Sequence, residues 1–277
     1  MENEEQEKDL NQEGPDGQSV RVPVRSDLTF RDDQKDFYWL SDVLRIKRKK
    51  DIRFRLVDSG VFDVHQLGDL VSAGADLYTS DEVRGSGSEL AILLKAAQKS
   101  GTIVAFFLYG DLPAEKLPES LTLSSLALLG KDGLNIHVSN REKERKISDL
   151  TTLAVQCRLG AGRLVYSHHG PLSQELIGLG REGAWIHISD RSLQSEQDSL
   201  LFRDLVSASK SAGANAVIHV ERDLSLAILS DAVKAGAAVL FKTLPKDFKS
   251  PLRPLEDEAK KKKLDFRAYY LSPTFLP

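Results

Sequence analysis

A regular alternation of short apolar segments with longer amphipathic ones restricts the fold of this chain more than any other feature of its sequence. Several of the longer stretches place apolar residues at i, i+3 and i+4, which is typical of helices with one buried face. Strands that alternate with helices form parallel sheets, and eight such units predict a (β/α)8 barrel. An open doubly wound sheet is the alternative. Eight segments have the length and composition of strands: residues 52–58, 76–80, 102–109, 134–139, 163–168, 184–189, 216–221 and 238–243.

Part of the sequence occurs twice. GADLYTSD, from Gly74, returns as GAWIHISD from Gly183, and LVDSG at 56–60 matches LVYSHHG at 164–170. Residues 93–112 and 121–139 match 205–224 and 224–242 in the same order. The copies stay in register, with small gaps, over four strand–helix units, which predicts a half-barrel duplicated in tandem.

In this organisation residues 52–243 resemble the TIM-barrel isomerases of histidine biosynthesis, which are also two fused half-barrels. The resemblance implies the architecture of those enzymes, and it would place Asp58 where they carry a catalytic aspartate after the first strand. The repeat partner of Asp58 is Tyr166, and the Gly-Ser phosphate loops of those enzymes have no counterpart here. We therefore extend the resemblance to architecture and not to chemistry.

Composition divides the chain into a central domain and two charged ends. Residues 1–33 are acidic and lack periodicity, which predicts a disordered tail, and 34–50 predict a short helix with a basic turn. The barrel is expected over 51–245. The extension 246–277 is charged and Pro-rich, and its EDEA before KKKK predicts an exposed helix with i,i+4 ion pairs.

The bulk properties favour a cytoplasmic protein. A formal net charge of −3 provides no general attraction to nucleic acid or to an anionic membrane. The single cysteine, Cys157, excludes an intramolecular disulfide, fits a reducing compartment and is expected in the core. No apolar run approaches the length that spans a bilayer, and the acidic start is unlike a signal peptide.

Residue parity along the strands predicts a polar interior. Ile136, Ile186 and Ile218 share the parity expected under the helices, so the opposite parity faces inward. Barrel interiors are usually filled by Val, Ile and Leu, because a buried polar group without a partner costs about 1–3 kcal/mol. The polar interior therefore predicts a ligand pocket at the carboxyl ends of the strands, where barrel active sites lie. The inward layers are Tyr78, His137, His187 and Leu240, then Ser80, Ser139, Ser189 and Lys242, with Phe107, His219, Tyr109 and Glu221 from the remaining strands.

These residue types favour an enzyme that acts on a small anionic metabolite, phosphorylated or carboxylate, without a cofactor. Lys242 is expected to act as a base or Schiff-base nucleophile, which is lyase or isomerase chemistry, or to form an ion pair with Glu221 that closes the barrel. Glu221, His187 and His219 are expected to move protons. The expected binding residues are Ser80, Tyr109, Ser139, Ser189 and Arg222.

Two alternatives stay open. In one, the chain is a metal-dependent barrel hydrolase, and His137, His187, His219 and Glu221 hold a divalent ion such as zinc or manganese that activates water. In the other, the barrel is not catalytic and binds a protein partner through its terminal tails. The absence of a nucleotide-binding glycine motif argues against a nucleotide ligand.

Overall fold

The computed structural model describes residues 28–47, 52–111, 121–221, 225–241 and 252–268. Ten parallel strands form one sheet whose spatial order is the order of the sequence. They are β1 Leu28–Arg31, β2 Phe54–Val57, β3 Ala75–Ser80, β4 Val104–Leu108, β5 Asn135–Ser139, β6 Arg163–His168, β7 Trp185–Ser189, β8 Ala216–Val220, β9 Ala238–Phe241 and β10 Phe266–Ala268.

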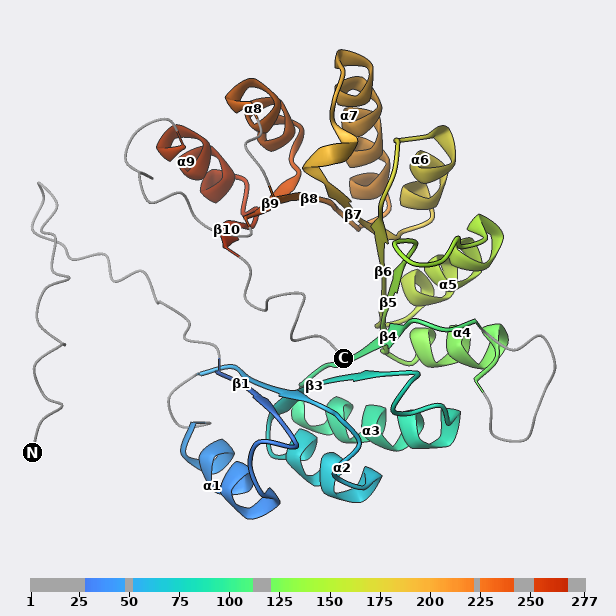
Figure 1. Ribbon diagram of the computed structural model, residues 1–277, viewed down its shortest axis with the longest axis vertical. Coiled ribbons are helices and arrows are strands. Elements are labelled where there is room, and N and C mark those ends of the chain that lie inside the picture. The colour runs from blue at the N-terminus through green and yellow to red at the C-terminus, as the bar shows by residue number, and fades with distance from the viewer. Residues whose placement is uncertain (1–27, 48–51, 112–120, 222–224, 242–251, 269–277) are drawn as a thin grey trace, which may run out of the picture.

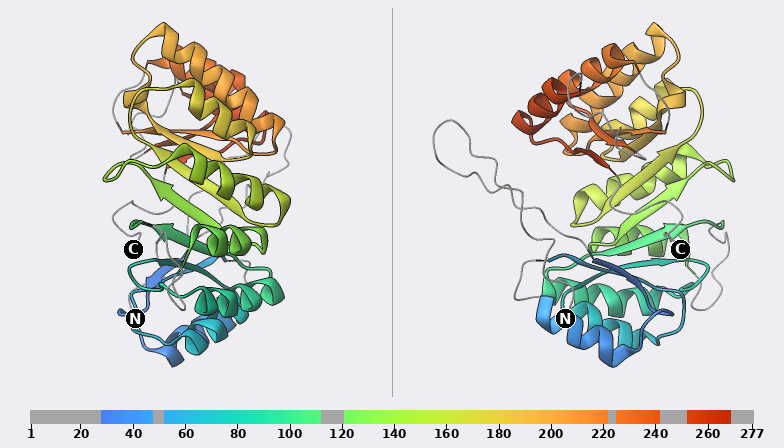
Figure 2. Two further views of the ribbon diagram at one scale, coloured as in Figure 1. Left: turned by 90° about the vertical axis from the view of Figure 1, so that its right-hand side faces the viewer. Right: turned by 60° about the vertical axis from the view of Figure 1, so that its left-hand side comes forward.

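Helices connect the strands and cover the outer face of the sheet. They are α1 Phe37–Lys47, α2 Val64–Ser72, α3 Gly87–Ser100, α4 Leu123–Lys131, α5 Ile147–Leu159, α6 Gln174–Arg181, α7 Glu196–Ser211, α8 Leu226–Ala235 and α9 Arg253–Lys261, with a 3-10 turn η2 at Asp190–Ser192. The strands follow an arc with the helices outside it (Figure 1), and two further views show the same single layer of helices (Figure 2). None of the described helices has the length and apolar character needed to cross a bilayer.

The predicted α/β fold, in which parallel strands alternate with helices as in a (β/α)8 barrel, is confirmed. All eight predicted strands form, as β2 to β9. The sequential strand order excludes the doubly wound alternative, in which the order reverses. The duplication of a half-barrel stays a prediction.

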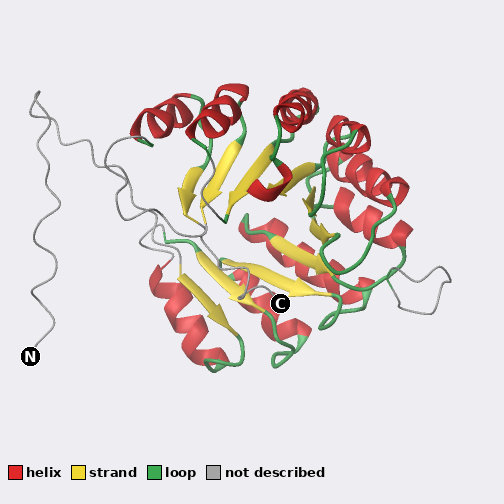
Figure 3. Cartoon of the chain, turned by 45° about the horizontal axis from the view of Figure 1, so that its top comes forward, coloured by secondary structure: helices red, strands yellow, loops and turns green. Residues whose placement is uncertain are grey.

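The strand number differs from the expected eight because the chain adds one strand at each end. Leu28–Arg31, expected in the disordered tail, pairs with β2, and the Phe30 ring stacks on Phe54 with centroids 5.3 Å apart. Phe266–Ala268 pairs with β9. Within the described residues β1 and β10 each pair with one strand, so they are the two edges of the sheet (Figure 1). A tilted view again shows the strands inside the arc of helices (Figure 3). The rest of the predicted tail, residues 1–27, lies outside the described residues, as do 269–277.

Two helices are described in the charged ends of the chain. Helix α1 lies within 34–50, and α9 carries the expected i,i+4 pairs, Lys260 with Glu256 at 2.8 Å and Lys262 with Glu258 at 3.4 Å. Cys157 is buried in the core, and this burial raises the pKa of its thiol to about 12.

The main apolar core lies between the sheet and the helices. Leu56, Ile136, Ile186 and Ile218 are fully buried there, as their strand parity predicts. Local signals position the helices, as at α2, where the Asp63 carboxylate accepts from the N–H of Gln66 in a capping box. The outer face of the sheet therefore packs against the helices. The strand residues of opposite parity lie on the inner face.

Candidate functional site

The inner face of the sheet carries the histidines that the sequence placed there. His137, His187 and His219 are half-buried, whereas their strand neighbours of opposite parity are buried under helices. The His137 ring stacks on Phe107 with centroids 4.6 Å apart. Nε2 of His219 lies 2.8 Å from Nδ1 of His187, so one ring donates a hydrogen bond to the other. Parity thus predicted correctly which side chains face inward.

Burial keeps these imidazoles neutral. Desolvation lowers the pKa of His137 to about 4 and that of His219 to about 4, and it lowers the pKa of His187 well below the ordinary 6.5. The nearby His219 and His137 rings lower the pKa of His187 further, since a second positive charge beside the first is unfavourable. Near neutral pH the three rings therefore act as hydrogen-bonding groups without charge.

The contacts of these rings bear on the proposed metal site. Within the part of the chain that the structure describes, no group of three His, Cys, Asp or Glu side chains is placed to hold a metal ion. The facing nitrogens of His187 and His219 bond to each other, and a shared ion would have to break that bond. Glu221 instead approaches Arg191, with 3.6 Å between the charged groups.

A pocket of about 540 Å³ lies at the carboxyl ends of β5 to β8. This is the edge at which (β/α) barrels place their active sites. Each of these four strands contributes residues from its end or from the loop that follows. The pocket is lined by Arg141, His169, Gly170, Pro171, Ser189, Arg191, Ser192, Gln194, Asp198 and Glu221.

Two polar side chains fix the loops that carry the pocket residues. Asn140, after β5, accepts from the backbone N–H of His169 at 2.7 Å and donates to its carbonyl at 3.2 Å. Asp190, after β7, accepts from the backbone N–H of Glu221 at 3.0 Å and from the Ser189 hydroxyl at 3.0 Å. We call a side chain that follows one strand and bonds the backbone after the next strand a strand-end clamp.

The pocket combines two guanidinium groups with an imidazole. Burial lowers the pKa of His169, and the positive charges of Arg141 and Arg191 lower it further, while Glu221 opposes them. Within the described residues no hydrogen bond or ion pair involves the Arg141 guanidinium, and Arg141 lines the pocket. The carboxylates of Glu221 and Asp198 line it as well, so the pocket carries charges of both signs beside a ring that can accept a proton.

Several predicted site residues lie at this pocket, and others do not. Glu221 and Ser189 line it, and Ser139 accepts from the backbone N–H of Arg141 at 3.1 Å. Ser80 is fully buried, and its hydroxyl has no hydrogen-bond partner in the described structure. Tyr109 is half-buried next to Asp81, and burial raises the pKa of its hydroxyl to about 12.

His187 and His219 lie on the inner face and do not line the pocket. Lys242 and Arg222 lie outside the described residues. Arg141 and Arg191 were not among the predicted site residues, although the sequence around them contains a recognisable pattern. Both follow a strand in the pattern Ser-[Asn/Asp]-Arg, as Ser139-Asn140-Arg141 and Ser189-Asp190-Arg191.

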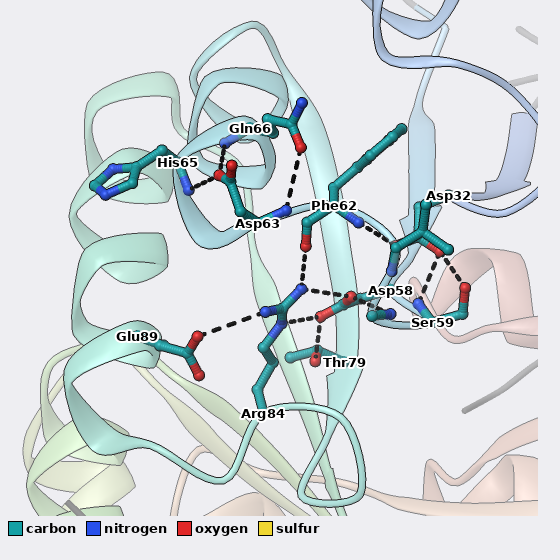
Figure 4. Close-up of polar contacts among 12 residues, drawn as sticks. Asp32, Asp58, Ser59, Phe62, Asp63, His65, Gln66, Thr79, Arg84 and Glu89 are labelled. Atoms are coloured by element: carbon teal, nitrogen blue, oxygen red, sulfur yellow. Dashed lines mark hydrogen bonds and ion pairs between the residues drawn. The ribbon is translucent and has the colours of Figure 1, made fainter.

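The edge formed by β1 to β3 is closed by a buried polar network (Figure 4). Arg84 donates to the Asp58 carboxylate from Nε at 2.9 Å and from Nη2 at 3.2 Å, and Thr79 donates to it at 2.8 Å. Arg84 also donates to the carbonyl of Phe62. Asp32 accepts from the backbone N–H of Ser59 at 2.8 Å.

Asp58 is fully buried in this network and points to the helix side of the sheet. It therefore does not occupy the catalytic position that the resemblance to the isomerases would give it. Its carboxylate is saturated by Arg84, Thr79 and the backbone N–H of Gly60.

Comparisons with known proteins identify no family. No protein-family model matches the sequence, and no curated protein does. Solved structures with a similar arrangement include the catalytic domain of a mannanase from Streptomyces sp. SirexAA-E, at 14% identity over 92% of this chain and 82% of that one, with a TM-score of 0.37. A protein named as a phosphonomutase from Burkholderia cenocepacia J2315 matches at 12% identity over 85% and 92% of the two chains, with a TM-score of 0.36. With such low TM-scores these likenesses carry no argument, and the fold rests on its own strand order.

Proposed function

We propose that the chain is an enzyme that binds a small anionic metabolite, phosphorylated or carboxylate, in the pocket at the carboxyl ends of β5 to β8. The observation that carries this proposal is the joint presence of Arg141, Arg191, His169 and Glu221 in one pocket. Guanidinium groups bind phosphate and carboxylate oxygens through two parallel hydrogen bonds, which is the strongest recognition that side chains offer to such anions.

The proposed chemistry is proton transfer of the lyase or isomerase type. His169 is the proton acceptor in this proposal, because burial and the neighbouring arginines lower its pKa and leave the ring neutral. Glu221, held in place by Asp190, is the second acid–base group. Lys242 follows β9 in the sequence and remains the candidate base or Schiff-base nucleophile.

The first test is anion binding by isothermal titration calorimetry, with inorganic phosphate and with succinate as probes. Arg141→Ala and Arg191→Ala should each weaken binding of the preferred probe at least about tenfold, because a charge-assisted hydrogen bond contributes about 1.5–3 kcal/mol and 1.4 kcal/mol is a factor of ten. Glu221→Gln should retain binding and lose turnover of any phosphorylated or carboxylate metabolite that the unaltered protein converts.

Arg181→Ala is the matched control, since Arg181 lies exposed in the last turn of α6, outside the pocket. It removes the same charge from the chain and should leave binding unchanged. The proposal is wrong if the unaltered protein binds neither anion, or if the pocket variants bind as tightly as Arg181→Ala does.

A further inference from the structure

We infer that Asn140 is a positioning residue of this pocket: it orients the His168 ring, with Nδ1 as acceptor and a hydrogen on Nε2, and fixes His169 at the pocket wall. The inference rests on the proposed function only in that His169 is taken as the group that meets the ligand. Asn140 is the residue directly after β5, and its side chain contacts the loop after β6 through both of its polar atoms.

The contacts determine where the proton of His168 lies. Asn140 Nδ2 lies 3.4 Å from Nδ1 of His168, and an amide nitrogen can only donate, so Nδ1 accepts. Nε2 of His168 lies 2.9 Å from the carbonyl oxygen of Pro171, which can only accept, so Nε2 carries the hydrogen. These two contacts orient the His168 ring with Nδ1 as the acceptor and with a hydrogen on Nε2.

Asn140 differs from the other strand-end clamps in its chemistry. Asp32, Asp81 and Asp190 accept backbone N–H groups in the same way, with carboxylates. A carboxylate in place of Asn140 would put an acceptor beside Nδ1 of His168, and Nδ1 would then need a hydrogen to bond to it. The amide provides the same acceptor for the His169 N–H together with a donor for Nδ1 of His168.

The position of His169 matters because several charged groups surround it. Arg141 follows β5, Arg191 lies in η2 and Glu221 follows β8, and all three act on the protonation of His169, as does the neighbouring His168 ring. By bonding the backbone N–H and carbonyl of His169, Asn140 holds this residue among those groups at the pocket wall.

The test uses the full chain and nuclear magnetic resonance of the histidine ring nitrogens at pH 7. The unaltered protein should show His168 with a hydrogen on Nε2 alone. Asn140→Asp should show a hydrogen on Nδ1 of His168, because the side chain facing Nδ1 is then an acceptor, while the His169 backbone amide stays protected from hydrogen exchange. Asn140→Ala should speed exchange of that amide about tenfold or more, since it removes the acceptor.

Asp81→Asn is the matched control, because it makes the reverse exchange at a clamp that bonds Tyr109 and Gly110. It should leave His168 as in the unaltered protein. The inference is overturned if His168 has the same protonation in Asn140→Asp as in the unaltered protein, or if Asn140→Ala leaves His169 exchange unchanged. Neither result depends on anion binding, so failure of this inference is distinguishable from failure of the proposed function.

Discussion

The carboxyl ends of the strands form one edge of the sheet, and both halves of this edge contain strand-end clamps. The two halves differ in what lies beside the clamps. At β1 to β4, Asp32 and Asp81 clamp the loops of the following strands, and the space beside β1 to β3 is closed by the buried Arg84–Asp58 pair. At β5 to β8, Asn140 and Asp190 make the same kind of clamp, and the space beside them is a pocket. We call β1 to β4 the sealed half of this edge and β5 to β8 the open half. Both halves have the same kind of clamp.

The difference lies in the side chains next to the clamps. Asp81 is followed by Glu82, whereas Asp190 is followed by Arg191, which lines the pocket. In the sealed half, Arg84 lies inside the structure with only 8% of its surface exposed, and its hydrogen bonds to Asp58 raise its pKa. Arginine thus lies in a buried ion pair in one half and lines a pocket in the other.

The largest expected loss of stability comes from removing the buried Arg84–Asp58 ion pair in the sealed half. Arg84→Ala leaves the Asp58 carboxylate buried without its main partner, and an uncompensated buried charge costs about 3–5 kcal/mol. We expect a loss of that size in the free energy of unfolding, measured by urea denaturation at pH 7.

Arg203→Ala is the control for that experiment. It removes an Arg–Asp pair with a single contact, 3.1 Å from Nη2 of Arg203 to Asp231, in which both side chains are about half exposed. Exposed pairs contribute about 0–1 kcal/mol, so this variant should be close to the unaltered protein in stability. Equal losses in the two variants would show that the buried network does not stabilise its half of the edge.

The sequence predicted the strands well because strand patterns are local. Alternation of apolar and polar residues located β2 to β9 and assigned His137, His187 and His219 to the inner face. It missed β1, since Leu28–Arg31 is recognisable as a strand only through its pairing with β2 and the contact of Phe30 with Phe54. The additional strand depends on a tertiary contact that no local pattern contains.

The candidate site was predicted less completely, for a related reason. Glu221 and Ser189 were found because strand parity reaches the strand ends. Arg141 and Arg191 are exposed residues beyond those ends, and their direction depends on how the loops fold. The clamps that fold these loops join residues 29 to 31 positions apart, as in Asn140 with His169 and Asp190 with Glu221.

The buried imidazoles of the inner face predict that the free energy of unfolding depends on pH. His137 takes up a proton at pH 6.5 when unfolded, but only near pH 4 when folded. The unfolded state therefore binds more protons in this window, so stability is complete above pH 6.5 and falls as the pH decreases toward 4. The loss due to His137 should reach on the order of 3 kcal/mol, at 1.36 kcal/mol for each pKa unit.

Unfolding by urea at a series of pH values measures this loss. His137→Phe keeps a ring beside Phe107 and cannot take up a proton, so its stability should depend less on pH between 6.5 and 4 than that of the unaltered protein. His65→Phe, at an exposed position on α2, controls for removal of an imidazole as such. Parallel pH curves for His137→Phe and the unaltered protein would contradict the assignment.

The smallest expected loss of stability comes from removing a strand-end clamp. Removing one clamp from each half also compares the two halves directly. Asp81→Ala and Asp190→Ala each leave backbone N–H groups without an acceptor, and each should cost about 1–3 kcal/mol in unfolding free energy. Only Asp190→Ala should also weaken binding of inorganic phosphate, by a few-fold, because Asp190 fixes Glu221 and starts the turn that carries Arg191. Equal losses of phosphate affinity in both variants would mean that the sealed half and the open half are not functionally distinct.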